Sequence, residues 1–295
     1  MIVNITSVNF YQKELHLLSY RHAFHAGNFA DVLKHSALSL VLDYFTQKQK
    51  GFSYIDSHSG AGMYKLTSEY AEKTSEYKDG IEKLLSAPNL PEELNCYLDI
   101  ITTLNASGKL ELYPGSPGIA KNFMRRQDSA HLYELHTSDN ALLNEFSSRW
   151  NKAKVYQSDG YKGVLAHVPP ATRRAVVLID PPYELKEDYQ KAVKTIIDGY
   201  KKFATGCYIL WYPVVKRSHV LAMERQFLDS NLKNVIQVEY CQSPDTEEYG
   251  MTGTGLFIVN PPWQLATQLS TVLEAMTKTL GSQTTSTKVN QLIPE

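Results

Sequence analysis

The sequence has 295 residues, of which 43% are hydrophobic, so it is long enough for one large domain or for a domain with an insertion. Its formal net charge of −1 excludes binding of nucleic acid through bulk positive charge, and its apolar runs are far shorter than the roughly 20 residues that cross a bilayer. The N-terminal residues lack a signal-peptide pattern and the three cysteines are widely separated, so we expect a cytoplasmic protein with reduced thiols and no membrane partner.

Strand and helix patterns alternate through most of the chain. Apolar residues recur at helical spacing over residues 29–44, and similar patterns predict helices at 188–203 and 218–230. Short apolar runs predict about seven strands, at residues 52–56, 131–134, 155–157, 175–180, 207–212, 235–240 and 255–260. This alternation predicts an α/β fold with a mainly parallel sheet and helices on both faces.

Residues 63–112 interrupt the alternation, because they lack a strand pattern and carry two amphipathic helix patterns, near residues 77–85 and 94–104. We interpret 63–112 as a small inserted helical subdomain within a main α/β domain formed by residues 19–62 and 113–280. Residues 1–18 are interpreted as an N-terminal extension. Residues 281–295 are rich in Ser, Thr and Gln and are expected to form a loosely held tail.

The first chemical motif is Asp56-Ser-His58-Ser-Gly60-Ala-Gly62, directly after a predicted strand. Gly60 and Gly62 would let the backbone approach a ligand closely, which fits a dinucleotide site, a methyltransferase or an ordinary tight turn. A nicotinamide-dependent oxidoreductase should have a third glycine at this turn, and the sequence continues to Lys65 without one. This rival enzyme class is therefore disfavoured.

Two further acids follow predicted strands. Glu134 ends the strand at 131–134, and its paired oxygens could accept from both ribose hydroxyls of an adenosyl group. Asp159 and the N–H of Gly160 follow the next strand and could read the adenine of a cofactor. Asp159 is equally suited to cap a helix, and the sequence alone leaves both interpretations open.

The most informative motif is Asp180-Pro181-Pro182-Tyr183, after the strongest strand pattern. The Asp180 carboxylate and the Pro181 carbonyl can each accept one N–H of an exocyclic amine, and the Tyr183 ring can stack on a base for about 1–3 kcal/mol. A base inside a duplex must be flipped out to reach such a pocket. Although the turn could simply end a strand, the motif predicts methylation of a base amine, with adenine N6 as the expected target.

Four histidines, His22, His25, His35 and His58, precede or lie within the first motif, but their spacing matches no zinc signature. No metal is therefore expected. A histidine or lysine beside the carboxylate of a zwitterionic cofactor fits these residues better.

Together these motifs resemble the bacterial 23S ribosomal RNA adenine-N6 methyltransferase J family, nearly end to end from Leu18. The segments that carry the resemblance are Leu18-Ser-Tyr-Arg-His-Ala-Phe-His-Ala-Gly27-Asn28, Asp31-Val-Leu-Lys-His35, Asp56-Ser-His-Ser-Gly-Ala-Gly62, Tyr113-Pro-Gly-Ser-Pro117, Glu134-Leu-His136, Asp159-Gly160, Leu178-Ile-Asp-Pro-Pro-Tyr-Glu184, Trp211-Tyr-Pro-Val-Val215 and Asn260-Pro-Pro-Trp263. Several long motifs in one order are more specific than any one of them.

The resemblance implies a Rossmann-like class I methyltransferase with a seven-stranded sheet, S-adenosylmethionine as the cofactor, and 23S rRNA that is protein-free or incompletely assembled as the substrate. Asp180, with Pro181 and Tyr183, would be catalytic, and Tyr20 would join Tyr183 on the substrate side. We expect a monomer. With the two glycines of the first motif included, we expect the cofactor to contact Lys34, His35, His58, Gly60, Gly62, Ser116, Glu134, Asp159, Gly160 and Asp180.

Two alternatives stay open from the sequence. A DNA adenine-N6 methyltransferase would carry the same Asp-Pro-Pro-Tyr turn, because DNA and RNA present the same amine, and only the whole-chain resemblance favours rRNA. A non-catalytic RNA-binding module would not need that turn. The residues before Leu17 have no counterpart in the resemblance, and we expect the natural start to lie near Leu17.

Overall fold

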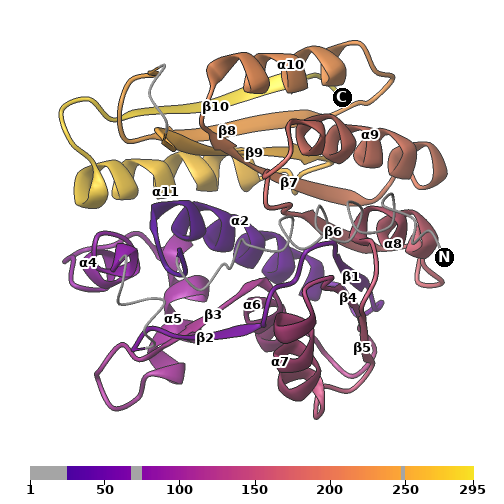
Figure 1. Ribbon diagram of the computed structural model, residues 1–295, viewed down its shortest axis with the longest axis horizontal. Coiled ribbons are helices and arrows are strands. Elements are labelled where there is room, and N and C mark those ends of the chain that lie inside the picture. Colours follow the sequence, from indigo (N-terminus) through magenta and orange to yellow (C-terminus); the bar gives the residue numbers. More distant parts are fainter. Residues whose placement is uncertain (1–24, 68–74, 247–249) are drawn as a thin grey trace, which may run out of the picture.

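The computed structural model describes residues 25–67, 75–246 and 250–295 and is built on one eight-stranded sheet, in the order β10-β8-β9-β7-β6-β1-β4-β5 (Figure 1). The strands β5, β4, β1, β6 and β7 pair in parallel, whereas β9, β8 and β10 join by antiparallel pairing. Their bounds are β1 Ser53–Asp56, β4 Ser129–Tyr133, β5 Ala153–Tyr156, β6 Ala175–Ile179, β7 Cys207–Val214, β8 Val235–Cys241, β9 Gly253–Val259 and β10 Ser286–Ile293. The predicted α/β fold with a mainly parallel sheet is confirmed.

Helices cover both faces of the sheet. One face packs against α2 (Phe29–Thr46), α6 (Ser116–Phe123), α7 (Thr137–Ser147) and α11 (Leu265–Leu280). The other packs against α8 (Gly160–His167), α9 (Lys186–Lys202) and α10 (Arg217–Leu228). Side chains of β6 alternate between the two cores. Because this central strand is buried on both faces, all of its residues are apolar.

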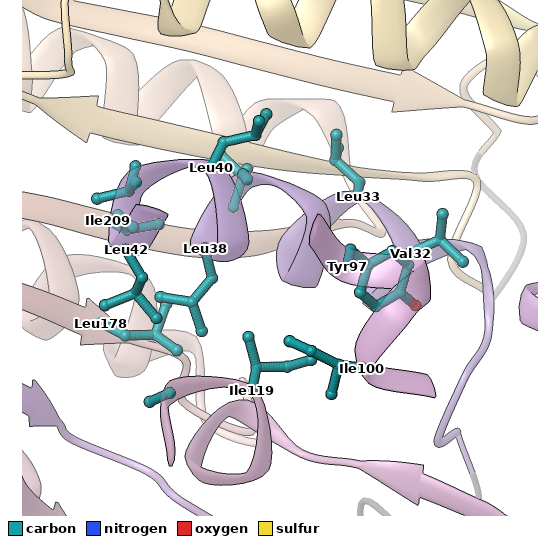
Figure 2. Close-up of a cluster of buried hydrophobic side chains, with 14 of the residues drawn as sticks. Val32, Leu33, Leu38, Leu40, Leu42, Tyr97, Ile100, Ile119, Leu178 and Ile209 are labelled. Carbon is teal, nitrogen blue, oxygen red and sulfur yellow. The ribbon is translucent and has the colours of Figure 1, made fainter. Parts of the chain in front are cut away.

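Helix α2 is buried along most of its length. It lies between the sheet and the inserted residues, and Figure 2 shows Leu42 of α2 beside Leu178 of β6 and Ile119 of α6 near Ile100. Asn28 caps its first turn, accepting from the N–H groups of Ala30 and Asp31 at 3.0 Å. This burial carries the polar side chains of the helix into the interior.

The inserted residues contain the two expected helices, α4 (Ile81–Leu85) and α5 (Asn95–Leu104), with the short 3-10 helices η2 (Glu76–Lys78) and η3 (Glu92–Leu94). The expectation that residues 63–112 hold no strand was wrong at both ends, where β2 (Met63–Lys65) pairs antiparallel with β3 (Leu112–Pro114). Strands of three residues are too short to produce a sequence pattern. The insertion also shares the α2 core rather than forming its own.

The C-terminal residues correct two expectations. The sheet has eight strands rather than seven, because β10 pairs antiparallel with β8, with Ser286 opposite Cys241 and Val289 opposite Val238. The expected loose tail at 281–295 therefore contains an ordered edge strand. Half of its side chains are exposed, whereas Val289, Leu292 and Ile293 are partly buried against the two cores, and hydrogen bonds of the backbone to β8 hold the strand. The polar composition of this segment was therefore a misleading signal. No helix among the described residues is long and apolar enough to cross a membrane.

Candidate active site

A cavity of about 490 Å³ opens at the carboxyl ends of the parallel strands. Its walls come from the loops after β1, β4, β5 and β6, with contributions from α2 and from the start of α6. In open α/β sheets, ligands bind in the crevice at this edge. The topology therefore brings residues that lie far apart in the sequence to one site.

Most of the predicted site residues meet in this cavity. Those that line it are Lys34, His35, His58, Gly60, Ser116, Glu134, Asp159, Gly160, Asp180 and Pro181. Gly62 and Tyr183 are not among the lining residues, and Tyr20 lies outside the part of the chain that the structure describes. The shared location supports one site, while the role of each residue stays a prediction.

Glu134 links two loops of the cavity. Its Oε2 atom accepts from the Gly60 backbone N–H at 2.8 Å, and its Oε1 atom accepts from the His136 N–H at 2.7 Å. Burial raises the pKa of the Glu134 carboxyl to about 7. The two oxygens are thus held in place beside the cavity, as recognition of a pair of hydroxyls would require.

Asp56 holds the loop after β1 in place beside the cavity. The sequence did not predict this role. Asp56 is fully buried and accepts from the hydroxyls of Tyr54 and Ser116, both at 2.7 Å, and from the His58 N–H at 3.3 Å. Burial raises the pKa of this carboxyl to about 6. An acid that ends a buried strand is the signal that could have identified it.

His58 is a neutral group at physiological pH. Burial lowers the pKa of its imidazole to about 4, and its ring lies edge-on to Tyr161 with centroids 4.9 Å apart. Its Nδ1 atom lies 2.7 Å from Ser57 Oγ. In the unligated site, the neutral His58 imidazole can therefore offer a hydrogen bond to a ligand.

Asp159 caps helix α8, since its Oδ1 atom accepts from the Lys162 N–H at 3.1 Å. It lines the cavity as well, so the capping interpretation and the cofactor interpretation are compatible. Gly160 is required by close packing: a Cβ atom there would lie 1.7 Å from the Ser57 carbonyl oxygen. Gly62 has φ +80°, and its carbonyl accepts from the Gly115 N–H at 3.1 Å, which shapes the loop behind the cavity.

The Asp180 carboxylate reaches across the sheet to α2. Its Oδ2 atom accepts from Lys34 Nζ at 2.7 Å, and the exposed fractions of the Asp180 and Lys34 side chains are 12% and 3%. Burial alone would lower the pKa of Lys34, but the carboxylates of Asp180 and Asp31 outweigh it and raise that pKa. Lys34, predicted as a cofactor contact, thus directly contacts the predicted catalytic acid.

Tyr183 has a left-handed backbone, with φ 53°. Its hydroxyl donates to the Trp211 carbonyl at 2.5 Å, and its ring centroid lies 4.5 Å from that of Tyr189 and 5.8 Å from that of Trp211. The ring is therefore packed against the protein's own aromatic side chains. Trp211 also lies beneath Lys34, whose Nζ is 5.3 Å from the indole centroid.

Several lining residues were not predicted from the sequence. Among them are Leu135, Asp139, Tyr161, Leu185 and Asp188. Leu135 follows Glu134 directly and has an exposed fraction of 57%. Among the described residues, no three His, Cys, Asp or Glu side chains are grouped so that they could hold a metal ion.

An acid or a glycine turn follows each of four parallel strands around one cavity. This arrangement and the sheet order are those of an S-adenosylmethionine-dependent methyltransferase. The family model described as "Ribosomal RNA large subunit methyltransferase D, RlmJ" matches residues 49–293. The chain belongs to this family.

Similar proteins support this assignment. A protein of Escherichia coli named ribosomal RNA large subunit methyltransferase J is 45% identical over 280 residues, which covers 95% of this chain and 100% of the relative. A protein of the same name from Haemophilus influenzae is 47% identical over 282 residues, with the same coverage. The crystal structure of protein LPL1258 from Legionella pneumophila is similar, with a TM-score of 0.85, 36% identity, and coverage of 90% of this chain and 98% of that one.

Proposed function

We propose that this methyltransferase modifies the N6 amine of one adenine in 23S rRNA, on RNA that is protein-free or incompletely assembled. The observation that carries the proposal is the Asp180 carboxylate, which follows β6 and lines the same cavity as Glu134 and Gly160. The names of the relatives from Escherichia coli and Haemophilus influenzae support large-subunit rRNA as the substrate class.

The cavity fits the cofactor. Its volume of about 490 Å³ falls within the range of small-molecule sites, and its donors and acceptors suit a nucleoside with a zwitterionic side chain. Glu134 would accept from the ribose hydroxyls, and Asp159 with the Gly160 N–H would bind the adenine. When bound, S-adenosylmethionine supplies a methyl group on a sulfonium as the electrophile.

The protein residues would orient the amine and receive its proton. Asp180 would accept one N–H and the Pro181 carbonyl the other, so that the nitrogen lone pair is directed at the methyl group from roughly 3–3.5 Å. An aromatic amine is a very poor acid, so Asp180 would take the proton only after the nitrogen has bonded to carbon. Electrostatic stabilisation of that developing positive charge is the expected source of the rate.

The adenine must leave its helix to reach Asp180. We propose that the part of the Tyr183 ring that Tyr189 and Trp211 leave exposed is a stacking surface for the flipped base, and that Tyr20 is a second contact on the substrate side. The protein is expected to act as a cytoplasmic monomer, and light scattering of the purified chain measures that state directly.

The test is transfer of a labelled methyl group followed by mapping of N6-methyladenosine. We expect label at one adenine of naked 23S rRNA, little on assembled large subunits, and none with Asp180→Ala. Label on DNA of the same sequence, at a rate equal to that on RNA, would instead assign a DNA adenine methyltransferase. Label on another base or atom would disprove the proposed target.

A further inference from the structure

We propose that Asp31 is a positioning residue for methyl transfer, which holds the Lys34 ammonium against Asp180 and shares its charge. Asp31 is a side chain of α2 that does not line the cavity. The inference rests on the proposed role of Asp180 as the acceptor of the amine. It assigns Asp31 a function through Lys34 rather than through contact with cofactor or substrate.

Asp31 is itself held in place from two sides. Its Oδ2 atom accepts from the Gly27 N–H at 2.9 Å, and its own N–H donates to the Asn28 side chain at 3.0 Å. Its exposed fraction is 1%, so the carboxylate cannot turn to solvent. The start of α2 thus fixes the position of Asp31 before any contact with the site.

Lys34 follows one helical turn later, on the same face of α2. Its Nζ atom lies 2.9 Å from Asp31 Oδ1 and 2.7 Å from Asp180 Oδ2, so one ammonium bridges two carboxylates. The Trp211 ring closes a further side of the ammonium, at 5.3 Å. His35 Nε2 is 4.0 Å from the same Asp31 oxygen.

The bridge has a consequence for the charge of Asp180. Because two carboxylates share one ammonium, Asp180 keeps more of its negative charge than it would in an isolated Lys34–Asp180 pair. Without the charge on Asp31, Lys34 would pair with Asp180 alone and compete with the amine for its oxygens, or would leave its position. Either change weakens stabilisation of the positive charge that develops on the amine nitrogen.

Asp31→Asn removes this charge and keeps an oxygen that can accept from the Gly27 N–H. Asp43→Asn is the matched control, because it makes the same substitution on the same helix at an exposed position. We expect Asp31→Asn to lower the single-turnover rate by about 10- to 100-fold, the loss that is typical when a residue that orients a metal ligand is replaced, because Asp31 orients Lys34 in the same indirect way. The KM for RNA and the affinity for S-adenosylhomocysteine should stay near those of Asp43→Asn.

Asp31→Glu, which restores the carboxylate, should recover part of the rate. If Asp31→Asn matches the control in single-turnover rate, or loses rate only in step with cofactor affinity or thermal stability, the proposal is wrong. If wild type methylates no adenine in rRNA, the proposed function fails separately.

A measurement without catalysis tests the bridge in every case. Acylation of Lys34 by an amine-reactive ester, read by mass spectrometry, should be slow in wild type and in Asp43→Asn. It should be faster in Asp31→Asn, because loss of one carboxylate partner lowers the pKa of the Lys34 amine. Equal protection of Lys34 in both variants would overturn the inference whatever the activity.

Discussion

The Gly60 backbone N–H donates to Glu134 Oε2 at 2.8 Å and so joins the glycine turn after β1 to the acid that follows β4. The two residues are 74 positions apart in the sequence, and the whole insertion lies between them. Because the same carboxylate also accepts from the His136 N–H, its orientation is set before a ligand arrives. Binding then requires little reorganisation of this acid.

The first prediction concerns the pH dependence of cofactor binding. The pKa of Glu134 in the folded protein is about 7, raised by burial, and ribose recognition needs the ionised form. The affinity for S-adenosylhomocysteine should therefore rise as pH increases from about 6 to about 8. Calorimetry across this range measures it.

Glu134→Gln provides the control, with weaker binding that no longer rises with pH. The stability of the unligated protein should change in the opposite direction to cofactor affinity. Because the pKa of the Glu134 carboxyl is raised in the fold, its contribution to stability is lost as pH rises through about 7. An affinity in wild type that is flat across neutral pH would contradict the assignment of Glu134.

The second prediction is that Asp180→Asn loses about 100-fold or more in methyl-transfer rate, while cofactor affinity stays within about tenfold. The amide keeps an acceptor oxygen but cannot take the proton, and Lys34 keeps Asp31 as its partner. Single-turnover kinetics and calorimetry give the two quantities. Abolished cofactor binding would mean that Asp180 is chiefly a binding residue.

The third prediction is that Gly160→Ala lowers both thermal stability and cofactor affinity. The new Cβ would lie 1.7 Å from the Ser57 carbonyl oxygen, so the loops after β1 and β5 must separate. We expect a cost of about 1–3 kcal/mol in the free energy of unfolding. Gly199→Ala is the control, because the nearest atoms to its Cβ would belong to the Tyr208 side chain, at 3.1 Å or more, and alanine favours a helix. Equal melting temperatures for the two variants would exclude this packing role.

The fourth prediction is that removal of residues 284–295 lowers the melting temperature and promotes aggregation. This truncation deletes β10 and leaves the edge of β8 unpaired, and such an edge can pair with another molecule. Thermal unfolding with light scattering provides the measurement. Thr287→Ala, at an exposed position of β10, should behave like wild type. A truncated chain that melts as wild type does would show that β10 contributes nothing to stability.

The sequence predicted those features that depend on local patterns. The apolar run of β6 and the acids after β4, β5 and β6 are local signals, and the topology then brings them to one edge. The contact between Lys34 and Asp180 joins residues 146 positions apart in the sequence, and no local pattern predicts a contact across such a separation. β10 was missed because Val289, Leu292 and Ile293 are too few to form a strand pattern among the polar residues of this segment, and pairing of the backbone with β8 supplies the rest.

The backbone of Tyr183, with φ 53°, has a further consequence. A tyrosine in the left-handed region costs on the order of 1 kcal/mol, which the surrounding contacts must offset. Glycine here would relieve that strain but would remove the ring, which packs against Tyr189 and Trp211 and donates to the Trp211 carbonyl. The same packing that fixes the ring therefore holds the backbone of this turn in a conformation that tyrosine rarely adopts.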